Sequence, residues 1–142
     1  MNVTAIRTGT GYSKAHFGEV IQGPIGEDEN NYRIGLQTLV CNKFGTTATF
    51  TPDDSNEIKT NPPGKNKSLK AAKIALRELG YPLLGGTLTL TNNFPPNSDG
   101  WGMGSSSADC LATADAIADA LGTQFTSIQK ARIAFEAEGA TD

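Results

Sequence analysis

Long apolar runs, basic clusters and paired cysteines are all missing from this sequence of 142 residues. No stretch is long and apolar enough to cross a bilayer, and the opening residues MNVTAIRTGTGYSK lack the apolar centre of a signal peptide. We therefore expect a cytoplasmic protein without a membrane partner. The formal net charge of -3 and the lack of any run of lysine or arginine argue against binding to nucleic acid.

Cysteine and histidine are scarce, which disfavours several kinds of site. Cys41 and Cys110 lie far apart and neither has a C-x-x-C partner, so the sequence predicts two buried free thiols rather than a disulfide or a structural zinc site. A Ser-His-Asp hydrolase would depend on the single histidine, His16, together with Ser106 and Asp142. The G-x-S-x-G pattern of such enzymes is missing, which disfavours this alternative.

The order of the predicted elements favours an α+β fold. Alternating and β-branched stretches predict strands over residues 4–12, 17–26, 32–40, 43–50 and 85–95, with 27–31 as a hairpin tip and 51–68 as a surface loop. Helical spacing predicts helices over residues 68–80, about 105–121 and about 127–138. Because most strands come first and as neighbours, we expect one domain over 1–142, with a mixed or antiparallel sheet and helices packed on one face.

Residues that typically begin or end helices occur at the ends of the predicted helices. Ser68 is the expected N-cap of the first helix and Gly80 its C-cap, while Thr126 or Ser127 is expected to cap the last helix. The strands over 32–40 and 43–50 are close enough in sequence to pair with one another.

A glycine-serine stretch precedes the second helix and has the composition of a phosphate site. An exposed helix N-terminus has unpaired N–H groups and partial positive charge, and phosphate is its natural ligand. Glycines let the backbone approach a ligand closely, and serine hydroxyls add further contacts. The residues concerned are Gly100, Gly102, Gly104, Ser105, Ser106 and Ser107. The alternative is a glycine turn in which a serine simply caps the helix.

Two better-known phosphate motifs do not fit this stretch. A Walker motif requires a lysine and a serine or threonine after its last glycine, and no lysine follows Gly104. The dipeptide Gly64-Lys65 lacks the rest of that motif. A dinucleotide fingerprint needs another glycine spacing and an acidic residue downstream.

The segment PPNSDGWGMGSSSAD nevertheless resembles the second motif of the GHMP kinases, P-x-x-x-G-L-G-S-S-A. In this sequence Pro96 begins the motif, Gly102-Met103-Gly104 stands for G-L-G, and the three serines follow. These kinases transfer the γ-phosphoryl group of ATP to a small molecule. The resemblance implies that the stretch from Gly100 to Ser107, Met103 included, binds ATP, and that the fold is the N-terminal domain type that also resembles domain 2 of ribosomal protein S5.

Two further segments resemble one branch of that family, the L-threonine kinases linked to propanediol utilisation. KAHFGEVIQGP contains its G-E-x-x-Q-G core, and AEGATD resembles its E-x-x-T-D segment. The residues with an implied role lie in these two segments or among the three serines. The resemblance implies Asp142 as catalytic base, Lys14 as a charge-neutralising catalytic lysine, His16, Glu19 and Gln22 as substrate contacts, and Ser106 with Glu138 as ligands of Mg²⁺.

The implied protein is an ATP-dependent kinase acting on L-threonine or another small hydroxylated metabolite. The implied cofactors are ATP and Mg²⁺. His16-Phe17 stands where the threonine kinases typically have Ser-Cys, so the acceptor stays open. Family members are about twice as long and carry a second domain, so we expect a missing C-terminal half or a dimer. The alternatives are a catalytically incomplete nucleotide- or phosphate-binding module and a structural domain of the S5 type.

Overall fold

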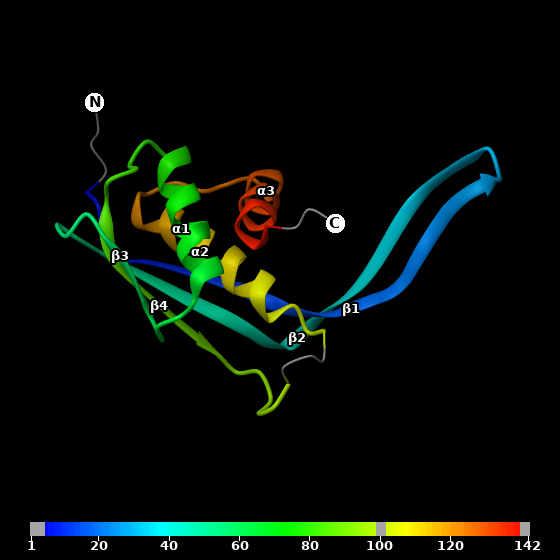
Figure 1. Cartoon of the computed structure of the whole chain (residues 1–142), viewed down its shortest axis with the longest axis horizontal. Coiled ribbons are helices and arrows are strands. Elements are labelled where there is room, and N and C mark those ends of the chain that lie inside the picture. Colours follow the sequence, from blue (N-terminus) through cyan, green and yellow to red (C-terminus); the bar gives the residue numbers. More distant parts are fainter. Residues whose placement is uncertain (1–4, 99–101, 140–142) are drawn as a thin grey trace.

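The computed structural model of the chain describes residues 5–98 and 102–139, and these form one sheet with three helices on one face (Figure 1). The strands are β1 (Gly9–Asp28), β2 (Asn31–Asp53), β3 (Ile58–Asn61) and β4 (Gly85–Asn92). The helices are α1 (Asn66–Glu78), α2 (Ser105–Ala120) and α3 (Ser127–Glu138). The expected α+β class is confirmed.

The sheet has the strand order β1-β2-β4-β3. β2 runs antiparallel to both β1 and β4, whereas β3 runs parallel to β4, so the sheet is mixed as predicted. The short strand β3 lies inside the predicted surface loop, where the sequence has no alternating apolar pattern that would predict a strand. Its connection to β4 runs through α1, as a parallel pair requires.

Helix α2 lies directly against β1 because both elements use very small residues at their contact. A Cβ atom added at Gly11 would collide with the Ala112 carbonyl oxygen, and one at Gly9 with that of Ala116. The alanine-rich sequence of α2 therefore serves close packing, and the helix is buried on most of its circumference between the sheet and the other two helices. Ala108, Ala112 and Ala118 are buried, while Leu111 and Leu121 are half-buried at the edge.

The hydrophobic core lies between the sheet and the helices. Phe50 and Leu88 from neighbouring strands are fully buried against Leu76, Ile117 and Ile133 from the three helices. Burying each large apolar side chain stabilises the fold by about 1.5–3 kcal/mol. Cys41 and Cys110 are buried free thiols, as the sequence predicts.

The helix ends confirm one expected cap and contradict another. Thr126 caps α3 through a capping box with Gln129, in agreement with the sequence. Helix α1 begins at Asn66 with Lys65 as its N-cap, so Ser68 is a buried residue of the first turn and the predicted cap is wrong. Gly80 follows the C-cap Leu79 with φ +85°, a left-handed value that glycine adopts readily.

The outer halves of β1 and β2 form a two-stranded arm that projects from the body (Figure 1). β1 is continuous where two strands were expected, and residues 32–40 and 43–50 belong to the single strand β2 instead of pairing with each other. The register of the pairing shifts at Lys14/Ala15 and at Phe17/Glu19, but the two strands remain paired on both sides of each shift. The predicted hairpin tip is confirmed, because the strands turn between Asp28 and Asn31.

No helix among the described residues is both long and apolar enough to cross a membrane.

Candidate functional site

The glycine-serine stretch ends in a left-handed turn that leaves the N-terminus of α2 uncapped. Gly104 is the N-cap of α2 with φ +65°, and Gly102 has φ +68°. Within residues 5–98 and 102–139, no side-chain cap hydrogen bond is made at the N-terminus of α2. The alternative in which a serine caps this helix is therefore wrong, and the serines, which are helical themselves, are available for other contacts.

A cavity of about 360 Å³ lies where the N-termini of α1 and α2 come together. Its polar lining comes from both helix starts. The lining residues are Gly64, Lys65, Asn66, Lys67, Ser68, Ser105, Ser106 and Asp109. The N-cap residue of α1 also makes no side-chain cap hydrogen bond, so two helix N-termini with partial positive charge flank one cavity that Lys65 and Lys67 line. An anion is the complementary ligand for such a cavity.

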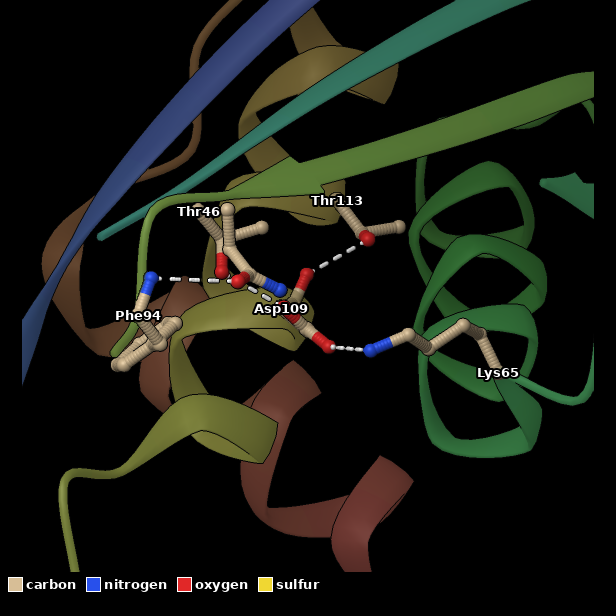
Figure 2. A network of polar contacts seen from close by, with 6 residues as sticks. Thr46, Lys65, Phe94, Asp109 and Thr113 are labelled. Atoms are coloured by element: carbon tan, nitrogen blue, oxygen red, sulfur yellow. Dashed lines mark hydrogen bonds and ion pairs between the residues drawn. The ribbon is translucent and has the colours of Figure 1, made fainter. Parts of the chain in front are cut away.

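Lys65 is held at this cavity by the buried carboxylate of Asp109, as Figure 2 shows. The Lys65 Nζ atom lies 2.8 Å from Asp109 Oδ2, and the Asp109 side chain is 7% exposed against 32% for Lys65. Thr46 Oγ1 donates to the other carboxylate oxygen of Asp109 at 2.7 Å. Both carboxylate oxygens are therefore satisfied, and the ammonium group is fixed while part of it still faces solvent.

Lys65, Asp109 and Thr46 were not predicted as site residues from the sequence. The nearest signal was Gly64-Lys65, which lacks the rest of a Walker motif. Asp109 ends the segment PPNSDGWGMGSSSAD, but no role was predicted for it. Since Thr46 is 63 residues and Lys65 is 44 residues from Asp109, only the fold brings the three together.

Ser107 faces a different neighbour from the other two serines. Its hydroxyl donates to both carboxylate oxygens of Glu138 at 3.1 Å, so the end of α3 meets the start of α2. A hydroxyl and a carboxylate are oxygen ligands of the kind that Mg²⁺ accepts when nucleotide phosphates complete its coordination. The described residues contain no group of three or more metal-ligating side chains. The pair therefore fits a cation that is shared with a phosphate ligand.

Cys110 lies in the same part of α2 but has no acid-base role at neutral pH. Burial raises the pKa of its thiol to about 12, and the charges of Glu138 and Asp109 add to the effect. The thiol consequently remains protonated.

Lys14 and His16 of the N-terminal motif line a second cavity of about 480 Å³. This cavity lies between β1, β2 and the helices α2 and α3, and Asp115 and Lys130 also line it. Lys14 Nζ donates to Asn42 Oδ1 at 2.8 Å. The structure thus brings two of the predicted site residues together, beside the helix whose N-terminus forms the first cavity.

The remaining predicted site residues lie elsewhere. Gln22 is exposed on the arm, and Met103 is buried below the turn. The side chain of Glu19 is not described, although its backbone belongs to β1. Gly100 and Asp142 lie outside the described residues.

Comparison with known proteins adds a family and a fold. The family described as GHMP kinases N terminal domain matches residues 66–142, which include α1, α2, α3 and the glycine-serine stretch. None of the curated proteins matches the chain.

Similar solved structures include homoserine kinase from Cytophaga hutchinsonii, with 19% identity, a TM-score of 0.63 and coverage of 97% of this chain and 42% of that chain. Mevalonate kinase from methicillin-resistant Staphylococcus aureus has 23% identity, a TM-score of 0.61 and coverage of 93% and 45%. Mevalonate diphosphate decarboxylase from Legionella pneumophila has 14% identity, a TM-score of 0.61 and coverage of 93% and 47%. These similarities show the fold, and the chain spans less than half the length of these three solved chains.

Proposed function

Because this chain belongs to the family of GHMP kinase N-terminal domains, we propose that it supplies the nucleotide-binding part of an ATP-dependent kinase for small hydroxylated molecules. The observation that carries the proposal is the cavity between α1 and α2. There the uncapped helix ends, the Ser105 and Ser106 hydroxyls and the Lys65 ammonium group surround one space of about 360 Å³.

The triphosphate of ATP fits the charge of this cavity. Phosphoryl transfer depends mainly on positioning and on neutralising the phosphate oxygens, and a lysine with several N–H donors provides both. Asp109 holds Lys65 from the buried side, so the ammonium group is oriented before the nucleotide arrives. Gly102 and Gly104 give the backbone the left-handed turn that exposes the N–H groups of α2.

Ser107 and Glu138 are the residues that we assign to Mg²⁺ when the nucleotide is bound. Ser106 was the serine expected from the sequence, but Ser107 is the one that contacts Glu138. The metal would offset phosphate charge. Ser106 then belongs with Lys65 as a phosphate contact.

We assign the acceptor to the side of the molecule where Lys14 and His16 line the second cavity. Lys14 would neutralise charge on the transferred group, and Glu19 and Gln22 would contact the acceptor, as the N-terminal motif implies. Asp142 would accept the proton of the acceptor hydroxyl. L-threonine is the first acceptor to test, because the motif resembles the threonine kinases, and L-homoserine and mevalonate follow because homoserine kinase and mevalonate kinases are among the similar structures.

Calorimetric titration with Mg·ATP tests the nucleotide site directly. We expect Lys65→Met to weaken binding by about tenfold, because a charged contact to phosphate is lost. Lys73→Met is the matched control, since Lys73 is exposed on the same helix and does not line the cavity. Equal affinities for the two variants would refute the assignment of Lys65, and absence of binding by the folded wild-type chain would refute the nucleotide site. Binding without turnover of any acceptor would limit this chain to nucleotide binding.

A further inference from the structure

The side chain of His16 occupies the space directly over Gly104, the residue at which the glycine-serine stretch turns into α2. A Cβ atom added at Gly104 would lie 2.6 Å from His16 Cε1, and closer still to Nε2 and Cδ2 of the same ring. A position with φ +65° already favours glycine. A side chain at position 104 would in addition have to displace the His16 ring, which is a second, independent reason for glycine there.

The backbone joins the same two segments. The N–H group of His16 donates to the carbonyl oxygen of Met103 at 3.0 Å, so β1 is hydrogen-bonded to the residue just before the turn. Met103 itself is 4% exposed and anchors the stretch in the protein interior. His16 therefore contacts two consecutive residues of the stretch, one through its main chain and one through its ring.

The imidazole ring belongs to a half-buried side chain. Its Nδ1 atom is buried and has no hydrogen-bond partner in the described part of the chain. A buried polar atom without a partner is costly, and a side chain retained in that state has a role that compensates for the cost. Filling the space over Gly104 is such a role.

From these contacts we infer that His16 is a positioning residue for the nucleotide: it fixes the left-handed turn at Gly104 and so aims the N-terminus of α2 at the phosphates. This inference rests on the proposed nucleotide site, and it gives His16 a task different from the acceptor contact implied by the sequence motif. It also links the two cavities, because His16 lines the one that contains Lys14 while supporting the N-terminus of the helix that borders the other.

A double-mutant cycle with a matched glycine tests the inference. Gly102 and Gly104 have nearly the same φ, +68° and +65°, but no atom of the described residues lies within 4 Å of a Cβ atom added at Gly102. Gly102→Ala therefore reports the backbone strain alone, whereas Gly104→Ala reports the strain together with the collision with His16. Each alanine is made in the wild-type chain and in the His16→Ala chain.

The measurements are the dissociation constant of Mg·ATP without any acceptor and the thermal unfolding midpoint without nucleotide. We expect Gly104→Ala to weaken nucleotide binding by about tenfold more than Gly102→Ala, and we expect His16→Ala to remove that excess. His16→Ala alone should weaken Mg·ATP binding in the absence of acceptor, which a residue that only contacts the acceptor would not do.

Additive effects of His16→Ala and Gly104→Ala on nucleotide affinity would overturn the inference and leave the proposed function intact. If the folded wild-type chain binds no Mg·ATP, the proposed function fails and this role fails with it, while the unfolding midpoints still report whether the ring and Gly104 are coupled. If Gly104→Ala does not fold, recovery of folded protein by His16→Ala supports the inference, and failure to recover it overturns the inference.

Discussion

At the residue scale, single carboxylates connect parts of the chain that are far apart in the sequence. Asp119 near the end of α2 accepts a hydrogen bond from the Thr10 N–H group at 2.9 Å and contacts Arg7 at 2.6 Å. The hydrogen bond from Thr10, with a smaller contribution from the charge of Arg7, holds the pKa of Asp119 below its usual range. The ionised form of Asp119 therefore stabilises the folded chain.

We predict a pH-dependent cost for Asp119→Asn. Because the pKa is lowered on folding, the stabilisation is present above the pKa of the unfolded chain and disappears as the pH falls through the lower pKa of the folded chain. The two side chains are partly exposed and screened by solvent, so the loss at pH 7 should be about 0.5 kcal/mol in the free energy of unfolding. Urea unfolding from pH 7 to pH 2 measures it, with Asp54→Asn as a control for loss of one exposed charge. A cost that is constant over this range would contradict the prediction.

At the element scale, the long ribbon of β1 and β2 divides into a packed half and a projecting half. Residues 46–53 of β2 pair with β1 on one side, as far as Phe50, and with β4 on the other. Residues 31–40 pair only with β1, and large apolar side chains such as Ile34 and Val40 are 71% and 63% exposed there. An isolated two-stranded ribbon is marginally stable in water.

We therefore predict that amide hydrogens of residues 31–37 exchange with solvent much faster than those of residues 46–50. The packed half should be protected up to the global free energy of unfolding, and the arm should open locally. Hydrogen exchange followed by mass spectrometry on peptides from both halves measures the difference. Equal protection would mean that the arm is covered in solution.

The same elements show what could be predicted from the sequence. The helix over 127–138 was predicted closely, because Thr126 and Ser127, the two residues offered as its cap, lie at its start and act locally. The continuity of β1 through residues 13–16 was not, because no local signal joins the two predicted strands and only the pairing with β2 carries the strand through. The glycine-serine stretch was found from composition, whereas Lys65 was missed because its partner Asp109 is distant in sequence.

At the scale of the whole molecule, the glycine-serine turn leads into α2, which borders both the α1–α2 cavity and the cavity lined by Lys14 and His16, and a ligand in one of them should stabilise the entire fold. α1, α2 and α3 pack on each other and on the sheet. A ligand that holds the N-terminus of α2 in place therefore stabilises the contacts that this helix makes throughout the core. A ligand that binds only the folded chain adds about 2.7 kcal/mol at a concentration of about one hundred dissociation constants.

We predict that saturating Mg·ATP raises the unfolding midpoint of this chain by several degrees, whereas adenosine at the same concentration leaves it nearly unchanged. The reason is that the cavity is lined by two lysines and three serines at two helix N-termini, groups that recognise phosphate, and its one carboxylate, Asp109, is paired with Lys65. Differential scanning calorimetry measures both midpoints, and Lys65→Met should reduce the shift caused by Mg·ATP. Equal shifts for Mg·ATP and adenosine would mean that the base rather than the triphosphate supplies the binding energy, and the assignment of the α1–α2 cavity to phosphate would then be wrong.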